Sequence, residues 1–389
     1  MLSALAIADD FTGAAEIAGI GMRHGLPTRL VRSIPHRTHG GLTVLDTDSR
    51  DLAPDDAARK VAQFVRPLRP ADYQLIYKKT DSVLRGPVLA EIQSLQSLLG
   101  RGAALLVPQN PSRGRTVVEG IYMIDGMPLD ATPFAQDPEH PARSARVLDL
   151  IGTSPLAHQP VRYLAPRDAL PHSGVVMGGA ASAKEIAAWA GKIDERALPA
   201  GGADFFRALL ERHGLSATRK FETSLPGKGA LFVNGSASAQ ARDLMRRAEQ
   251  ERVAVCAMPG AIYSGDATSR DAMTEWEECV HASLKSQSRV VMTIGRPLDR
   301  VHGASSRLLT ALIEVAARVM TKQRVAHVFS DGGATASALA RRLNWNDFDV
   351  TGELASGVVR MRVATTREQH LVVKPGSYVW PDTVWSAST

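Results

Sequence analysis

Short apolar runs alternate with helix-like segments along almost the whole chain of 389 residues, and this alternation constrains the fold most strongly. In the first half, strands are predicted at residues 4–8, 28–31, 42–45, 74–77 and 103–107, with helices at 14–24, 55–65 and 87–99. In the second half, strands are predicted at 230–234, 253–257, 290–294 and 325–330, with helices at 239–251, 270–285, 305–320 and 335–343. Strands that alternate with helices favour an α/β fold with largely parallel sheets.

The alternation is interrupted after residue 107, where Pro, Gly, Asp and Asn are frequent and a hairpin over 117–127 is predicted to turn at Asp125-Gly126. Further elements are predicted as helices at 143–151, 183–190 and 203–213, and as strands at 161–164, 174–177, 358–363 and 370–373. Residues 214–229 are polar and punctuated by Pro226, Gly227 and Gly229, which indicates a linker. We therefore expect two three-layer α/β/α domains, residues 1–215 and 228–389, with the active site in the interdomain cleft.

The composition argues against several classes of function. The residues are 44% hydrophobic and 22% charged, which is typical of a globular protein. Two cysteines are too few for a disulfide framework and lack metal-ligand spacing, so a cytoplasmic location is expected. The N-terminus lacks a basic segment and is predicted as a core strand, and no apolar run is long enough to span a membrane. The net charge of +6 is scattered and aromatic residues make up 5%, which argues against a nucleic-acid partner.

Charged turns follow three of the strands predicted in the first half. The turns are Asp9-Asp10-Phe11-Thr12-Gly13, Asp46-Thr47-Asp48-Ser49-Arg50 and the segment from Lys78 to Pro87. Because the carboxyl ends of parallel strands lie at one edge of a sheet, these turns are expected to lie together. Crowded carboxylates need cations, a metal or a hydroxylated ligand to satisfy them. The mixture of acidic and basic residues therefore suits an anionic ligand that also carries hydroxyl groups.

Both kinds of charge have a role in such a site. Arginine and lysine would hold the acid group of the ligand, and aspartate would accept hydrogen bonds from its hydroxyls. An aspartate that is bound to a hydroxyl can also act as its general base. A purely structural interpretation, in which Asp10 and Thr12 cap the next helix and Asp48 caps a turn, accounts for one or two of the acids but not for all of them.

Glycine-containing turns follow two strands predicted in the second half. They are Asn234-Gly235-Ser236-Ala237-Ser238 and Ser330-Asp331-Gly332-Gly333-Ala334-Thr335, and Lys374-Pro375-Gly376-Ser377 is a third candidate. Glycine lets the backbone approach a phosphate, and the N–H groups of a helix N-terminus point toward the anion. Each turn is also common without a ligand, and neither the P-loop nor the dinucleotide-binding fingerprint is present.

Together, these motifs resemble those of the four-carbon acid sugar kinase family, formerly a domain of unknown function. The family start Ala-Asp-Asp-Leu-Thr-Gly-Ala matches residues 8–14, Asp-Thr-Asp-Ser-Arg matches 46–50, and Lys-Lys-x-Asp-Ser-Thr-Leu-Arg-Gly matches 78–86 with Val83 in place of Thr. A Gly-Arg-Thr segment matches residues 114–116. In the second half, Gly-Ser-x-Ser matches 235–238, Gly-Gly-acid-Thr matches 332–335, and Lys-x-Gly matches 374–376.

The resemblance implies an ATP-dependent kinase for small acid sugars such as threonate, erythronate or 3-oxo-tetronate, with Mg²⁺ expected alongside ATP. It implies that the N-terminal domain binds the acid through Asp9, Asp10, Arg50, Lys79, Thr80, Asp81 and Ser82. It implies that the C-terminal domain binds the nucleotide through Ser236, Ser238, Gly332, Gly333, Ala334, Thr335 and Gly376. Lys79 and Arg85 are candidates for contacts with the carboxylate or the γ-phosphate, and Asp9, Asp10 or Asp81 is the expected catalytic base. The metal ligands, the particular acid, the phosphorylated hydroxyl and any homo-oligomer stay open.

One position departs from the family pattern, because Ala334 stands where the family has an acid, and Asp331 is a candidate replacement. This departure keeps open a non-catalytic homologue that binds a sugar acid without transferring phosphate. The segment Asp46-Thr47-Asp48 also resembles the nucleophile motif of haloacid-dehalogenase-type phosphatases, with Asp46 as the nucleophile. That motif normally follows the first strand of its fold, and no matching acidic pair occurs late in this sequence.

Overall fold

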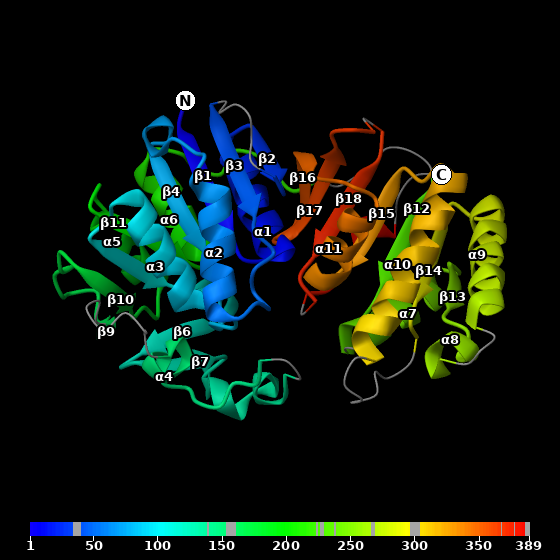
Figure 1. The fold of residues 1–389 in the computed structure, drawn as a ribbon, viewed down its shortest axis with the longest axis horizontal. Helices are drawn as coiled ribbons and strands as arrows, with labels where there is room; N and C mark the ends of the chain where they lie inside the picture. The colour runs from blue at the N-terminus through cyan, green and yellow to red at the C-terminus, as the bar shows by residue number, and fades with distance from the viewer. Residues whose placement is uncertain are drawn as a thin grey trace. The chain divides into compact units, whose positions relative to one another are not determined.

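A computed structural model describes residues 1–33, 40–137, 140–152, 161–222, 225, 229–236, 239–265, 269–295, 304–366, 368–376 and 378–385. The chain divides into two compact units, Met1–Arg219 and Lys220–Thr389 (Figure 1). The boundary falls within the residues predicted as a linker, of which Pro226 and Gly227 lie outside the described residues. Both units combine helices with a largely parallel sheet, which confirms the predicted α/β class.

The strands of the first unit form a parallel sheet. Their order is β2 (Thr28–Val31), β3 (Gly41–Asp46), β1 (Ser3–Ala8), β4 (Leu75–Lys79), β11 (Ala197–Gly201), β5 (Ala103–Val107), β10 (Gly174–Gly178) and β9 (Val161–Leu164). In this register, Ala8 pairs with Asp46 on one side and with Lys79 on the other. The three charged turns therefore leave the sheet at the same level, as the sequence predicted.

Strand β11 was not predicted, although it lies between β4 and β5 in the sheet. Its sequence is short, and Pro199 at its centre lacks the N–H that a central strand normally donates. The strand tolerates this proline because its pairing with β4 involves only Ala200 and Gly201. The pairing pattern of the sheet, and not the sequence of the strand, makes this segment extended.

Helices cover both faces of this sheet, which gives the three layers that were predicted. On one face, α1 (Phe11–Arg23) packs against α6 (Ala203–Arg212), and α6 packs against α5 (Ala183–Gly191). On the other face, α2 (Pro54–Val65) packs against α3 (Val88–Leu99). Helix α1 begins where the side chain of Asp10 accepts a hydrogen bond from the Gly13 N–H group.

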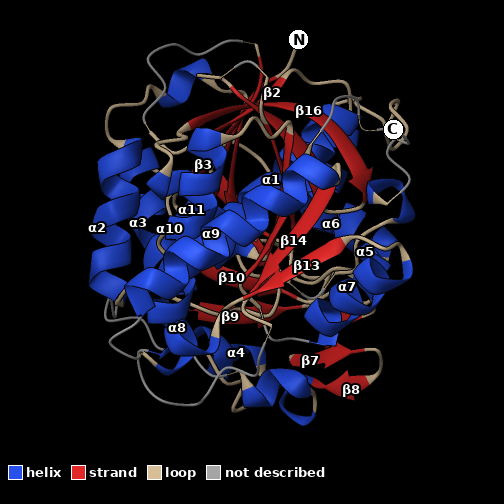
Figure 2. Cartoon of the chain, turned by 90° about the vertical axis from the view of Figure 1, so that its right-hand side faces the viewer, coloured by secondary structure: helices blue, strands red, loops and turns tan. Residues whose placement is uncertain are grey.

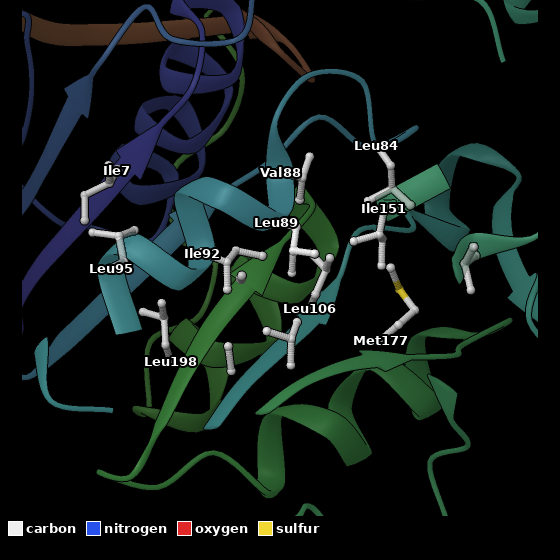
Figure 3. Close-up of a cluster of buried hydrophobic side chains, with 14 of the residues drawn as sticks. Ile7, Leu84, Val88, Leu89, Ile92, Leu95, Leu106, Ile151, Met177 and Leu198 are labelled. Atoms are coloured by element: carbon white, nitrogen blue, oxygen red, sulfur yellow. The ribbon is translucent and has the colours of Figure 1, made fainter. Parts of the chain in front are cut away.

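The core beneath α2 and α3 fixes the helix that follows the Lys78–Pro87 turn (Figure 3). In α3, Val88, Ile92 and Leu95 recur at helical spacing and are fully buried against Ile7 and Leu106 of the sheet. Burial of each such side chain contributes about 1.5–3 kcal/mol. Because α3 is packed into this core, the C-terminal end of the Lys78–Pro87 turn is held in place.

A separate antiparallel sheet interrupts the first unit between β5 and β9. It comprises β6 (Arg115–Val118), β7 (Ile121–Ile124) and β8 (Met127–Pro128), and α4 (Val147–Ile151) follows it. Strands β7 and β8 pair across Asp125-Gly126, which confirms the predicted turn. The additional turn between β6 and β7, at Glu119 and Gly120, was not predicted, and both of its residues have positive φ angles.

The second unit has its own sheet. Its order is β13 (Ala254–Ala257), β14 (Arg289–Thr293), β12 (Ala230–Asn234), β15 (His327–Asp331), β18 (His370–Lys374), β17 (Val358–Val363) and β16 (Asp347–Ala355). The strands from β13 to β18 are parallel, and β17 is antiparallel to both of its neighbours. Strands β17 and β18 confirm the predictions at 358–363 and 370–373, whereas β16 was not predicted.

Helices also cover both faces of the second sheet. Helix α9 (Ser269–Ser286) lies over β13 and β14 (Figure 2) and packs against α8 (Gly260–Ser264) and α10 (Ala304–Lys322), and α10 packs against α11 (Gly333–Arg342). Helix α7 (Ala239–Gln250) packs on the other face, where Phe232 stacks between Phe329 and Trp385. Within the described part of the chain, none of the helices combines the length and apolar character that a membrane crossing requires.

Candidate active site

The guanidinium group of Arg50 joins the turn after β3 to the turn after β1. Its Nε donates to Asp9 at 2.7 Å and its Nη2 donates to Asp10 at 2.7 Å, while Nη1 lies 3.8 Å from Asp81. The backbone supports the same arrangement, because the N–H groups of Ser49 and Arg50 both donate to the Asp9 carbonyl. The structure therefore brings together four of the residues predicted for the acid: Asp9, Asp10, Arg50 and Asp81.

The turn from Lys78 to Pro87 is shaped by Asp81. Its Oδ2 accepts hydrogen bonds from the N–H groups of Val83 and Arg85, and the Arg85 side chain binds both of its oxygens at 2.9 and 3.0 Å. Gly86 has a φ of 83°, and a Cβ there would lie 2.7 Å from the Arg50 carbonyl oxygen. Only glycine fits this approach, so the turn rests directly on the backbone of Arg50.

The three candidate bases differ in how their oxygens are used. Both oxygens of Asp81 are occupied, and both oxygens of Asp10 bind the first turn of α1 or Arg50. Asp9 uses Oδ2 for Arg50, whereas its buried Oδ1 has no hydrogen-bond partner among the described residues. Asp9 is therefore the carboxylate that retains an acceptor atom for a ligand.

Charge keeps two of these carboxylates ionised. Burial alone would raise the pKa of Asp9, but the positive charges of Arg50, Lys78 and Lys79 outweigh it and the pKa is lowered. Burial likewise opposes ionisation of Asp81, but Arg85 and Arg50 hold its pKa well below the usual range. Both groups therefore act as hydrogen-bond acceptors at neutral pH.

The two lysines of the turn point into the protein. Lys78 is fully buried and lies 2.9 Å from Glu91 of α3, whose carboxylate also accepts a hydrogen bond from Ser49. Lys79 donates to the Thr80 carbonyl at 2.9 Å and lies 3.5 Å from Glu16 of α1. The Thr80 hydroxyl is buried and has no hydrogen-bond partner among the described residues. The predicted contacts of Lys79 and Thr80 with the acid stay predictions.

Asp46, the nucleophile of the phosphatase alternative, does not present a free carboxylate. Its Oδ2 accepts from Arg32 at 3.0 Å, its Oδ1 accepts from the Asp48 N–H at 3.0 Å, and the residue is 1% exposed. Burial raises the pKa of Asp46 to about 7 although Arg32 opposes this shift. A buried carboxyl group that is half protonated near neutral pH is a poor nucleophile.

The antiparallel sheet of β6, β7 and β8, called the antiparallel insert below, contributes side chains to which the sequence analysis assigned no role. Arg115, the first residue of β6, donates to the Ser82 hydroxyl, and Tyr122 of β7 donates to the Ser82 carbonyl at 2.5 Å. Arg115 and Arg85 each lie 5.7 Å from the centre of the Phe134 ring. The Gly-Arg-Thr motif marked Arg115 in the sequence, but no role followed from it.

In the second unit, polar residues gather at the carboxyl ends of the parallel strands. The register aligns Asn234 with Thr293 on one side and with Asp331 on the other, and it aligns Asp331 with Lys374. Asn234 donates to the Thr293 hydroxyl at 3.2 Å and accepts from the Ser236 N–H at 3.0 Å. The turns predicted for the nucleotide therefore leave one edge of the sheet.

Helix α11 begins at this edge, and its N-cap residue is Gly332, which has no side chain to cap the helix. Gly332 has a φ of 86°, and no described atom lies within 4 Å of a Cβ built on Gly332 or on Gly376. Thr335 lies beside the Gly235 turn, because a Cβ on Gly235 would be 2.7 Å from its hydroxyl. The backbone at Gly332 and Gly376 thus borders open space, and Gly333, Thr335 and Ser236 lie in the same turns or beside them. Ser238 lies outside the described residues.

Asp331 and Lys374 form a buried ion pair beneath these turns. Lys374 Nζ lies 2.5 Å from Asp331 Oδ1, and both side chains are at most 1% exposed. Burial raises the pKa of Asp331 and lowers that of Lys374, although each charge partly offsets the shift of the other. Ala334 lies in the first turn of α11 and is exposed, so Asp331 occupies a different, buried position from the acid that Ala334 replaces.

Two family models match the chain. A sugar-binding N-terminal domain matches residues 4–188, and a nucleotide-binding C-terminal domain matches residues 231–378. A protein from Bordetella bronchiseptica named D-threonate kinase is 29% identical over 90% of this chain and 88% of its own length. A protein from Methylobacterium radiotolerans named 3-oxo-tetronate kinase is 24% identical over 96% of this chain and 95% of its own length.

A solved structure has the same fold. The crystal structure of a Salmonella typhimurium protein superposes with a TM-score of 0.80 at 18% identity and covers 99% of this chain and 98% of its own. The two family models account for most of the chain in the order that its motifs follow. The chain belongs to the four-carbon acid sugar kinase family.

Proposed function

We propose that this protein is an ATP-dependent kinase that phosphorylates a hydroxyl group of a four-carbon acid sugar such as threonate, erythronate or 3-oxo-tetronate. The similar proteins named as kinases for these acids support the proposal. The structural observation that carries it is Asp9, which binds Arg50 through one oxygen and leaves the other without a described partner. A carboxylate fixed in this way can accept the hydrogen bond of a substrate hydroxyl.

In the proposed reaction, the substrate hydroxyl donates to Asp9 Oδ1. Its oxygen forms a bond to the γ-phosphorus of ATP, the bond from that phosphorus to the β,γ-bridging oxygen breaks, and the proton passes to Asp9. The lowered pKa keeps Asp9 ionised, so its unpartnered oxygen can accept the proton of the hydroxyl. Arg50 and the buried lysines keep Asp9 ionised and oriented until the substrate binds.

Three features of the second unit support the binding of a triphosphate. The N–H groups at the start of α11 and the open surface at Gly332 and Gly376 suit phosphate oxygens. Lys374 lies at the same edge, where it is buried and paired with Asp331. Ser236 and Thr335 add hydroxyl groups beside these turns. The interdomain position of the active site stays a prediction.

The residues of the second unit also fit a Mg²⁺ ion. Magnesium in kinases usually binds phosphate oxygens, water and one or two carboxylates, so a cluster of protein ligands is not required. Asp331 would hold the ion, because its Oδ2 has no hydrogen-bond partner among the described residues. The ion would neutralise charge on the phosphate oxygens. The use of Mg²⁺, the cytoplasmic location and any homo-oligomer stay predictions.

The proposal is tested by measuring ADP release with ATP, Mg²⁺ and a panel of D- and L-threonate, D- and L-erythronate and 3-oxo-tetronate. We expect at least one acid to raise ADP release well above the rate without acid. Phosphorylated product should be detected by mass spectrometry in the same reaction. If no acid in the panel raises ADP release, the chain does not have this activity. Saturable binding of an acid without ADP release would indicate the non-catalytic alternative.

A further inference from the structure

The basic residues predicted for the acid are already paired with carboxylates. Arg50 binds Asp9 and Asp10, and Arg85 binds Asp81 and lies 3.1 Å from Asp137. The buried lysines are paired in the same way, Lys78 with Glu91 and Lys79 with Glu16, and Arg32 is paired with Asp46. An acid sugar would meet neutralised cations here and several carboxylates, so its own carboxylate needs a further positive charge.

Arg115 is a cation at this edge without a carboxylate partner among the described residues. Its guanidinium donates to the hydroxyl of Ser82 and lies over the Phe134 ring. Its backbone is fixed by the hydrogen bond from its N–H to the Asn110 carbonyl and by pairing with Ile124 of β7. Arg115 is partly exposed, so its remaining donors can reach a ligand.

The partners of Arg115 place it next to the rest of the site. Ser82 follows Asp81 in the chain, and its carbonyl is held by Tyr122. Asp81 lies 3.8 Å from Arg50, which in turn binds Asp9. A short series of contacts therefore leads from the guanidinium of Arg115 to the carboxylate that would bind the reacting hydroxyl. Arg115 and Asp9 therefore belong to one connected set of polar side chains.

We propose that Arg115, with the hydroxyl of Ser82, binds the carboxylate of the four-carbon acid and makes the site specific for acids over neutral polyols. The planar guanidinium matches a carboxylate with two parallel hydrogen bonds, and the Phe134 ring lies beneath it. This inference rests on the proposed kinase function. It assigns a role to a residue of the antiparallel insert that lies outside the two sets predicted from the sequence.

The test compares Arg115→Ala and Arg115→Lys with the wild type, using calorimetric binding of the acid without ATP and steady-state kinetics with ATP. The substrates are the preferred acid and its uncharged primary amide. We expect Arg115→Ala to weaken acid binding and raise the KM for the acid about 10- to 100-fold, since hydrogen bonds to charged groups contribute about 1.5–3 kcal/mol. The preference for the acid over the amide should fall by a similar factor, while the KM for ATP changes little. Arg115→Lys should recover part of the loss.

Arg59→Ala is the matched control, because Arg59 is an exposed arginine on α2 that pairs with Asp56. It removes one positive charge from the same unit and should leave acid binding unchanged. If the wild type binds and phosphorylates the acid and Arg115→Ala keeps the full preference over the amide, the role of Arg115 is wrong while the kinase function stands. If the wild type neither binds nor turns over any acid, the kinase function fails and the inference fails with it.

Discussion

The guanidinium of Arg50 lies 2.7 Å from the Asp9 carboxylate and so couples the turn after β3 to the turn after β1. Lysine cannot reproduce this contact together with the one to Asp10, because an ammonium group is a point charge on a flexible stem. We expect Arg50→Lys to lower kcat/KM for the acid about 10- to 100-fold, the equivalent of one or two charged hydrogen bonds.

The measurement is steady-state kinetics with both substrates varied, accompanied by the Tm of each variant. The KM for ATP should stay within about twofold of the wild-type value, a change of roughly 0.4 kcal/mol. Arg59→Lys serves as the control, since Arg59 is exposed on α2. Unchanged acid kinetics in Arg50→Lys would remove Arg50 from the acid site.

Asp9→Asn and Asp10→Asn form a matched pair that identifies the base. Asparagine caps a helix about as well as aspartate, so Asp10→Asn should keep α1 intact. It should also lower kcat by about tenfold or less, the effect of roughly one hydrogen bond. Asp9→Asn should lower kcat by about 10²–10⁴-fold, the range associated with loss of general base catalysis. A larger loss of kcat in Asp10→Asn than in Asp9→Asn would make Asp10 the base.

Gly332→Ala should weaken nucleotide binding. Its backbone, at φ 86° and ψ 155°, is strained for other residues by about 1–3 kcal/mol, and a methyl group would occupy the open surface before α11. We expect the KM for ATP to rise by about tenfold or more, which corresponds to about 1.4 kcal/mol. The KM for the acid should change little.

Gly100→Ala controls for backbone strain, because Gly100 also has a positive φ of 63° and no described atom within 4 Å of a built Cβ. It ends α3 in the first unit and should lower the Tm while the KM for ATP stays unchanged. An equal rise of the KM for ATP in both variants would mean that destabilisation, and not the nucleotide surface, explains the Gly332→Ala effect.

Asp46→Asn should change how stability depends on pH. Burial raises the pKa of Asp46 to about 7 in the folded protein, against an ordinary value of 3.8, so the folded state binds the proton more tightly than the unfolded state. The wild type therefore loses stability from this group as the pH rises from about 4 to about 7. The Tm of Asp46→Asn relative to the wild type should increase over this range and stay level above it. If the Tm difference between Asp46→Asn and the wild type were the same at pH 5 and pH 8, this would contradict the raised pKa of Asp46.

The two cysteines should differ in reactivity. Cys256 is buried, and burial raises the pKa of its thiol to about 12, whereas Cys279 is exposed on α9. We expect iodoacetamide at pH 8 to modify Cys279 first, because the thiolate is the reactive form. Peptide mapping after brief labelling checks this expectation, and Cys279→Ser should label slowly. Faster labelling of Cys256 than of Cys279 would contradict it.

Periodicity and the charged turns were sufficient to predict the α/β class, most strands of the parallel sheets and the gathering of Asp9, Asp10, Arg50 and Asp81. These features are local, since apolar runs and turn residues report directly on strands and their ends. Strand β11 could not be predicted, because Pro199 and a short apolar run give no local signal and its place depends on pairing with β4 and β5.

The sequence by itself determined which residues belong to each turn, since the motifs are contiguous and parallel strands end at one edge. Only the tertiary structure decided which charges are already paired. The commitment of Lys78 to Glu91, the unsatisfied oxygen of Asp9 and the approach of Arg115 to Ser82 depend on contacts between residues that are distant in the chain. Pairing of charges is a property of distance and burial, and neither can be deduced from the order of residues along the chain.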